Sequence, residues 1–218
     1  MEQIELRPEG AEDRRAVEEL TREAFWNVYG PGCAEHYLVH IMREDPAFVP
    51  ELDYVAAQGG QVVGSILYTR AKILGDDGEE RPVLCFGPIS VLPRKQGQGV
   101  GLALIGRTKD LARRMGHRAI VITGDPEYYR RAGFVPAETF GIRTAGDEYA
   151  AALLACELEP GTLADAAGRF VEAPVYQLDE KAVEEFDQGF PPREKRSGLP
   201  SQRRFLELAA QTRPRDGA

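Results

Sequence analysis

The stretch VLCFGPISVLPRKQGQGVGLAL, residues 83–104, decides how the chain folds. Its first ten residues are mostly apolar, Pro93 interrupts them, and three alternating glycines lead into an apolar pattern with helical spacing. The pattern predicts a strand that runs into a helix through a glycine-rich loop. The first N–H groups of a helix have no partner within it, and the helix dipole places partial positive charge there. The loop is therefore a candidate phosphate-binding site.

Two better-known phosphate loops do not fit the spacing of the glycines. A nucleoside-triphosphate loop ends in Gly-Lys-Ser/Thr, whereas Gly99 is followed here by Val100 and Gly101. A dinucleotide fingerprint needs G-x-G-x-x-G and a later acidic residue, and Gly97, Gly99 and Gly101 give only G-x-G-x-G. A nucleotide-binding protein is therefore disfavoured. A turn without a ligand is the plainest alternative, but three glycines in five positions cost chain entropy, which favours a ligand lying close to the backbone.

Composition and charge exclude several classes of protein. With 218 residues, 43% of them hydrophobic, the chain is long enough for a buried core, and its net charge of −8 disfavours nucleic acid as a partner. The three cysteines, Cys33, Cys85 and Cys156, fit neither a disulfide framework nor a paired zinc motif. No segment is apolar enough to span a membrane, and the N-terminus lacks a signal-peptide pattern. These features predict a cytoplasmic protein with no membrane partner.

Hydrophobic periodicity predicts strands and helices on both sides of the glycine loop. Strands are expected at residues 3–7, 52–57, 62–74, 83–92, 119–122 and 150–157, and helices between residues 13 and 29, at 34–43 and at 100–115. The Gly59-Gly60 pair favours a tight hairpin turn. The strand, helix and strand within residues 83–122 favour a right-handed parallel crossover.

Three side-chain patterns have more than one interpretation. Gly64, inside an expected strand, indicates either the close approach of another segment or a bulge. His36 and His40 are one helical turn apart and are able to chelate a metal, but no third ligand stands near them, so we expect no metal site. The helix at 100–115 is expected to bury one face, made of Val100, Leu104, Leu111 and Met115.

A second motif follows about thirty residues after the glycine loop. Tyr128-Tyr129 are followed, after three residues, by Gly133-Phe134. Together with Gln96-x-x-Gly99-x-Gly101, this motif resembles the GNAT superfamily of N-acyltransferases, whose acyl-CoA loop reads Gln/Arg-x-x-Gly-x-Gly/Ala. The resemblance covers roughly residues 4–157. It implies an α/β (α+β) fold with a mixed, mostly antiparallel central sheet, flanked by helices and splayed at the acyl-CoA site.

The resemblance also implies an activity and a binding site. The expected enzyme moves an acetyl group from acetyl-CoA, its cosubstrate, to a primary amine by direct attack in a ternary complex, without a metal. The strand before the loop is implied to pair with the pantetheine arm, and a main-chain N–H near Val91 to polarise the thioester carbonyl. Arg94 and Lys95, and also Arg130 and Arg131, are either near the CoA phosphates or simply solvated. The residues implied to bind acetyl-CoA are Ile89, Ser90, Val91, Arg94, Gln96, Gly97, Gln98, Gly99, Val100 and Gly101.

Tyr129 matches the tyrosine of the family motif and is the candidate general acid. A phenol with a pKa near 10 is able to protonate a departing thiolate with a pKa near 8.5 at hydrogen-bond distance. Tyr128 is expected to be ordinary core packing. Cys85 lies in an apolar strand, where a thiol is usually inert.

The general base is left open by the sequence. Many relatives carry a glutamate on the strand before the loop, where this chain has Cys85-Phe86-Gly87-Pro88. Glu35, His36, Asp53 or a water chain remain as alternatives. The missing carboxylate supports a second hypothesis, a CoA-binding sensor or regulatory module with little catalytic activity.

The shared motifs do not reach the C-terminal part of the chain. We expect a GNAT acyltransferase domain at residues 1–158 and a partly helical extension at residues 159–218 that packs on or beside it. Helical patches are expected at residues 182–186 and 205–209, and disorder from Arg213 onward. The extension leaves homodimer formation open. The acidic charge weakly favours a cationic acceptor, a small-molecule or peptide amine, without identifying it.

Overall fold

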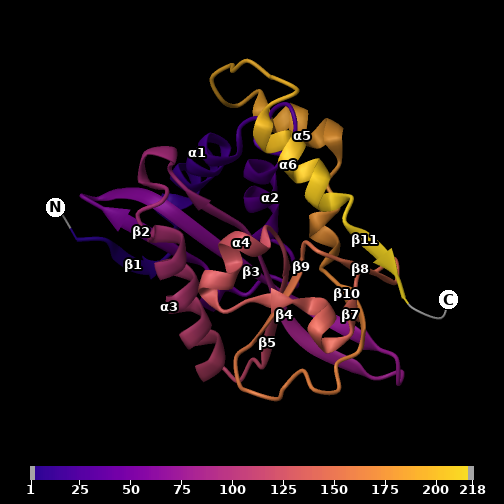
Figure 1. Ribbon diagram of the computed structural model, residues 1–218. Coiled ribbons are helices and arrows are strands. Elements are labelled where there is room, and N and C mark those ends of the chain that lie inside the picture. The colour runs from indigo at the N-terminus through magenta and orange to yellow at the C-terminus, as the bar shows by residue number, and fades with distance from the viewer. Residues whose placement is uncertain (1–2, 216–218) are drawn as a thin grey trace.

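The structure, a computed structural model, describes residues 3–215 and is built on one large sheet (Figure 1). Its strands run in the order β1-β2-β3-β4-β5-β9-β6, and β10 pairs with both β3 and β7. Parallel pairing is confined to β4–β5 and β7–β10, so the expected mixed, mostly antiparallel sheet is confirmed. The strands of this sheet are β1 (Glu5–Pro8), β2 (Tyr54–Gln58), β3 (Gln61–Gly75), β4 (Glu80–Val91), β5 (Ala119–Thr123), β6 (Val135–Pro136), β7 (Ile142–Arg143), β9 (Leu153–Glu157) and β10 (Gly168–Val171).

Helices cover both faces of the sheet. The Ser90 hydroxyl lies 2.9 Å from the Thr21 hydroxyl of α1, whereas the side chain of the next residue, Val91, lies against Gly101 of α3. Because successive strand residues point to opposite faces, α1 and α3 pack on opposite sides of β4. The α-helices of the described residues are α1 (Arg14–Phe25), α2 (Glu35–Met42), α3 (Val100–Arg114), α4 (Pro126–Tyr129), α5 (Glu180–Asp187) and α6 (Pro200–Ala209).

The predicted crossover is present, and the sheet opens within it. β4 pairs with β3 along its length, with a register shift opposite Gly87-Pro88. Its pairing with β5 is limited to Leu84 and Ile120. Beyond Leu84, β4 therefore continues toward the glycine loop without a neighbour on its β5 side. This divergence is the splay that the resemblance implied.

The packing of α3 resolves two of the expectations. A Cβ on Gly64 would lie 3.0 Å from the Val100 side chain and 3.2 Å from that of Leu104. Close approach of α3 is therefore the reason for glycine in β3. Val100 and Leu104 are buried as expected, but Met115 is 38% exposed, because α3 ends at Arg114 and Met115 lies beyond its last turn. That part of the predicted buried face is wrong.

Two predictions near the C-terminus are corrected by the structure. The single strand expected at 150–157 is divided into β8 (Glu148–Ala150) and β9, separated by a turn. The disorder expected from Arg213 is wrong for Arg213 and Pro214, because β11 (Thr212–Pro214) pairs with β8. The rest of that expectation, at residues 216–218, lies outside the described residues.

The sheet continues past residue 158. β10 pairs with β3 over four residues, and its Phe170 belongs to the main hydrophobic core. The predicted helical patches are present as α5 and α6. Among the described residues, no helix is long and apolar enough to cross a membrane.

Candidate acetyl-CoA site

The glycine loop presents a row of backbone N–H groups at the start of α3. Gly97 and Gly99 have φ angles of 72° and 86°, a left-handed conformation that favours glycine, and Gly99 is the N-cap of the helix. The Gln96 N–H donates to the Leu92 carbonyl at 3.1 Å and is therefore satisfied. From Gly97 to Gly101, in contrast, no N–H group donates a hydrogen bond to another group of the described residues. Since Gly97, Gln98 and Gly99 are exposed, their amides are accessible to an anion.

The open edge of β4 offers main-chain groups from alternate residues. The Leu92 N–H donates to the Val63 carbonyl of β3 at 3.0 Å. In an antiparallel ladder alternate residues bond to the same side, so Ser90 also faces β3 while Ile89 and Val91 face the open edge. The Val91 carbonyl accepts a hydrogen bond from Gln96 Nε2 at 3.0 Å, which leaves the Val91 N–H directed into the splay. Ser90, expected to offer main-chain groups there, is instead turned toward β3 and buried.

Tyr129 is held in a packed environment on α4. Asp125 caps this helix by accepting from the Glu127 N–H at 2.9 Å. The Tyr129 ring lies so close to Gly124 that a Cβ there would be 2.3 Å from a ring carbon. The rings of Phe86 and Phe134 lie 5.9 and 5.8 Å from it. Burial raises the pKa of the Tyr129 phenol far above its usual range, which keeps it protonated.

Tyr128 differs from the expectation that it is core packing. Its side chain is 38% exposed, and its hydroxyl lies over Gly101, where a Cβ would be only 2.2 Å away. The short α4 turns consecutive residues in different directions, so Tyr129 points inward and Tyr128 lies against the start of α3. A side chain at position 101 would therefore displace the Tyr128 hydroxyl.

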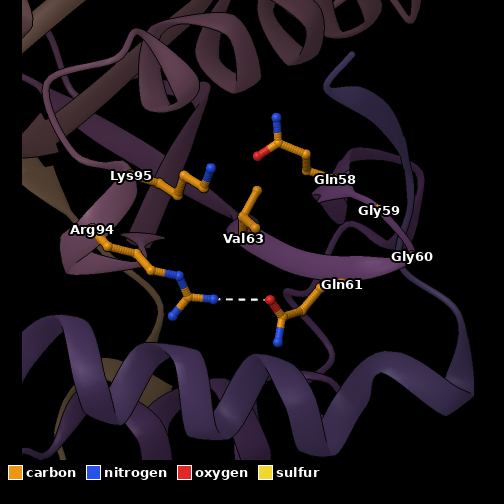
Figure 2. Close-up of a pocket in the computed structure, with 7 residues that line it drawn as sticks. All are labelled: Gln58, Gly59, Gly60, Gln61, Val63, Arg94 and Lys95. Atoms are coloured by element: carbon orange, nitrogen blue, oxygen red, sulfur yellow. Dashed lines mark hydrogen bonds between the residues drawn. The ribbon is translucent and has the colours of Figure 1, made fainter. Parts of the chain in front are cut away.

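One cavity lies beside the glycine loop and another lies along α3. Arg94 and Lys95 line one of about 530 Å³ together with the β2–β3 turn, and Arg94 Nη2 donates to Gln61 Oε1 at 2.8 Å (Figure 2). A second cavity, of about 310 Å³, lies along α3 and includes Arg131. Its lining residues are Leu102, Ile105, Gly106, Lys109, Asp110, Arg113, Arg131 and Ala132. Both cavities carry cationic side chains, and those of the first, Arg94 and Lys95, directly precede the loop with unpaired amides.

Two of the three candidate bases lie in closed environments. His36 is fully buried, with Nε2 3.1 Å from Asp187 Oδ1, and burial lowers the pKa of its ring to about 4. Asp53 lies with Glu9 and Arg43 at the β1–β2 side of the sheet, and burial, followed by the charge of Glu9, raises its pKa to about 8. β2 is separated from β4 by β3, so Asp53 is remote from the splay.

Glu35 differs from the other two candidates in lying near Tyr29, which in turn lies near Tyr129. It accepts hydrogen bonds from Cys33 Sγ at 3.3 Å and from the Ala34 N–H at 3.1 Å, and burial raises the pKa of its carboxyl. The carboxylate of Glu35 raises the pKa of the Tyr29 phenol, and Tyr29 in turn raises the pKa of the Tyr129 phenol. The sequence could not rank these three residues, because their ranking depends on which segments the fold buries.

The other candidate chemistry is absent from the described residues. His40 Nδ1 lies 2.8 Å from Glu18 Oε1 and His36 faces Asp187, so the two histidines contact different carboxylates. No group of three metal-ligating side chains occurs in the part of the chain that the structure describes. Burial raises the pKa of the Cys85 thiol to about 12, which keeps it protonated and inert.

A parallel strand pair that opens above a loop of unpaired amides defines the architecture of the N-acyltransferases that the sequence resembles. The model of the acetyltransferase (GNAT) family matches residues 16–134, more than half of the chain. The chain belongs to this family, which is a family of enzymes.

Curated relatives carry the same family name. The chain is 37% identical over 100 residues to the uncharacterized N-acetyltransferase YjhQ of Escherichia coli K12, covering 45% of this chain and 54% of that protein. It is 30% identical over 132 residues to the uncharacterized N-acetyltransferase YhbS of the same strain, covering 60% of this chain and 73% of that protein. The chain thus spans about half of the first relative and nearly three quarters of the second.

Solved structures with CoA ligands share the fold. The Escherichia coli YhbS structure in complex with CoA superposes with a TM-score of 0.72 at 26% identity, covering 82% of this chain and 94% of that one. A GNAT acetyltransferase of Brucella melitensis in complex with acetyl-CoA superposes with a TM-score of 0.63 at 27% identity. This match covers 81% of this chain and 99% of that one.

Proposed function

We propose that this protein is an N-acetyltransferase that moves an acetyl group from acetyl-CoA to a primary amine by direct attack in a ternary complex. The observation that carries the proposal is the row of unpaired amides from Gly97 to Gly101, which begins in an exposed loop at the N-terminus of α3 and follows the open edge of β4. Structural relatives with CoA or acetyl-CoA bound support the choice of donor.

The proposed binding mode assigns each part of the donor to groups of this chain. The diphosphate accepts hydrogen bonds from the loop amides, supported by the dipole of α3. The pantetheine amides pair with Ile89 and Val91 as an added strand would. Arg94, beside the loop, is proposed to attract the donor phosphates, so its loss would raise the KM for acetyl-CoA without abolishing turnover.

The proposed chemistry is a direct displacement at the thioester. The neutral amine attacks the carbonyl carbon, and the Val91 N–H stabilises the oxyanion; a donor of this kind contributes about 10²-fold or more in rate. The C–S bond then breaks, and the thiolate takes a proton from Tyr129. Burial raises the pKa of this phenol, and exclusion of water by the bound donor raises that of the departing thiol in the same direction. Glu35 is proposed to accept the proton that the amine loses, directly or through water, and Tyr129 is reprotonated from solvent.

A CoA-binding sensor with little catalytic activity is the second candidate. It is favoured by the residues at 85–88 of β4, which provide no carboxylate at the position where many relatives carry one. Free-thiol release with acetyl-CoA and a panel of amines separates the two functions. An enzyme releases thiol in the presence of the correct amine, whereas a sensor binds the donor and releases almost none.

A thermal-shift series with acetyl-CoA, CoA and ATP tests the proposed donor. Acetyl-CoA and CoA should each raise the Tm, since a ligand present at 100 times its Kd stabilises the folded state by about 2.7 kcal/mol. ATP should have little effect. A rise with ATP alone would overturn the donor assignment.

Location and assembly are also proposals. The cysteines Cys33, Cys85 and Cys156 are all free, which supports a reducing, cytoplasmic compartment. Homodimer formation stays a prediction, and the molar mass measured in solution by light scattering decides it.

A further inference from the structure

Two aromatic side chains from distant parts of the chain meet beside Tyr129. The ring centroids of Tyr29, between α1 and α2, and Phe205, on α6, are 4.8 Å apart. Tyr29 is 45% exposed and Phe205 39% exposed, although each contacts the other. Large aromatic surface left open beside a proposed catalytic group is typical of a binding site.

Phe205 is held in place by a polar network and not only by the ring contact. Gln202 of α6 is buried, and its Nε2 donates to the Asn27 carbonyl at 3.0 Å. The Asn27 side chain donates to the Glu194 carbonyl at 3.0 Å and accepts from the Arg196 N–H at 3.0 Å. The segment that carries Tyr29 and the segment that carries Phe205 are therefore fixed to each other before any ligand binds.

α6 contacts both the α1–α2 connection and the start of α4. At one end it is fixed to the α1–α2 connection, and along its length Arg204 lies 3.4 Å from Asp125, the residue that caps α4. Beyond α6, the chain pairs through β11 with β8 (Figure 1). The aromatic pair therefore lies between the α1–α2 connection and α4, the helix that carries Tyr129.

The charges around the aromatic pair favour a cation. Glu35 and Asp125 both act electrostatically on the Tyr29 hydroxyl. Arg204 offsets Asp125 in part, since the two form an exposed pair, whereas Glu35 has no cationic partner among its contacts. Of these charges, the carboxylate of Glu35 is the one that favours the approach of an ammonium group to Tyr29.

We propose that the acceptor is a small primary amine carried on an aromatic or bulky apolar body, and that Tyr29 and Phe205 bind that body. The inference rests on the acetyl transfer proposed above and names the class of its acceptor. Ring surface buried by the acceptor contributes to binding, and the amine is then directed toward Glu35 and Tyr129. A small hydrophilic amine would leave most of the apolar ring surface uncovered.

The test uses the full-length protein with acetyl-CoA and two series of amines, measured by free-thiol release. Phenethylamine, tyramine and isoamylamine form the apolar series; ethanolamine, spermidine and glucosamine form the polar series. We expect kcat/KM to be at least tenfold higher for the apolar series. Phe205→Ala should raise the KM for phenethylamine about tenfold and leave the KM for acetyl-CoA unchanged.

Two further variants separate a binding role from a structural one. Phe205→Tyr keeps the ring and should retain the KM for phenethylamine within about twofold. Leu206→Ala, on the next residue of α6, removes a side chain that is 63% exposed and should leave both series unchanged. Circular dichroism and Tm verify that each variant is folded. If Phe205→Ala unfolds, the comparison of the two amine series on the unmodified protein carries the test.

The outcomes distinguish this inference from the proposed function. If polar amines are acetylated as well as or better than the apolar series, the acceptor class is wrong and acetyl transfer stands. If acetyl-CoA binds but no amine of either series reacts, the acceptor inference is rejected as well. If acetyl-CoA neither binds nor shifts the Tm, the proposed function itself fails.

Discussion

At the scale of single residues, Tyr129 is the sharpest test of the proposed chemistry. Tyr129→Phe removes the hydroxyl and keeps the ring that packs on Gly124 and Phe86. We expect kcat to fall by about 10²-fold, the lower end of the usual contribution of a general acid, with the KM for acetyl-CoA nearly unchanged. Thiol-release kinetics measure both values.

Tyr149→Phe is the matched control for this change. Tyr149 lies in β8, where its ring contacts Arg213, away from the splay. Its loss of a hydroxyl should leave kcat unaffected. An unchanged rate in Tyr129→Phe as well would assign the general acid to another group.

Glu35 gives a second prediction at the residue scale, through the pH dependence of the rate. Burial raises the pKa of its carboxyl, so the carboxylate that acts as base forms only above the usual range for glutamate. The acidic limb of kcat/KM should therefore lie above pH 4.3, the ordinary pKa of a glutamate. Glu35→Gln should lower kcat by about 10²-fold and alter this limb.

Glu23→Gln is the control for the Glu35 variant, because Glu23 lies on α1 and faces solvent. Both variants remove one carboxylate and change the net charge equally. Identical pH–rate profiles for the two would remove Glu35 from the mechanism and leave a water chain as the route for the proton.

At the scale of elements, the junction of β4, loop and α3 depends on the left-handed conformation of Gly99. Its φ of 86° is unfavourable for a residue with a side chain, so Gly99→Ala should destabilise the fold by about 1–2 kcal/mol. The same change turns the loop amides and should raise the Kd for acetyl-CoA. Urea unfolding and titration calorimetry measure the two effects.

Gly106→Ala, on the same helix, should change the stability of the fold in the opposite direction. Gly106 lies inside α3, and a Cβ there meets no atom within 4 Å. Alanine should therefore stabilise the helix by about 0.5–1 kcal/mol. If both glycine variants were destabilised equally, the backbone conformation of Gly99 would not be the cause.

At the scale of the whole molecule, α5 is attached to the helices at the start of the chain by a buried polar cluster. Arg22 of α1 donates to Asp187 at 2.6 Å, and His36 of α2 faces the same carboxylate, with Glu18 also nearby. The rings of Phe186 and Phe190 pack on His36 at 5.3 and 5.0 Å. The extension thus contributes to the same folded unit as α1 and α2.

The buried His36 makes the stability of this assembly depend on pH. Burial lowers its pKa to about 4 in the folded protein, whereas an unfolded histidine has a pKa near 6.5. Below pH 6.5 the unfolded chain binds a proton that the folded chain does not, so stability is lost as the pH falls toward 4. Between pH 7.5 and 5.5 the loss from this residue should be about 1 kcal/mol.

His36→Gln should remove this part of the pH dependence, which urea unfolding at pH 7.5 and 5.5 measures. Asp53, whose raised pKa of about 8 gives the opposite slope in the same window, is present in both proteins and cancels in the comparison. Equal pH dependence in the two proteins would contradict the buried neutral state of His36.

The sequence by itself determined the parts of the fold that short-range chemistry fixes. The strand, glycine loop and α3 follow from Pro93, the alternating glycines and the helical pattern, and the β2–β3 turn follows from Gly59-Gly60. Gly133-Phe134 marked the end of the α4 region, where Gly133 has a φ of 83°. These features depend on the backbone preferences of neighbouring residues, which can be read directly from the sequence.

Only the tertiary structure decided which side chains meet. The alternation of hydrogen bonding in the β3–β4 ladder directs the main-chain groups of Ile89 and Val91, but not those of Ser90, toward the splay. The packing of α2 places Glu35, unlike His36 and Asp53, near Tyr29 and through it near Tyr129. The contact of Phe205 with Tyr29 joins residues 176 positions apart in the chain. Register, burial and long-range contact arise from the packing of whole elements, so no local pattern in the sequence carries them.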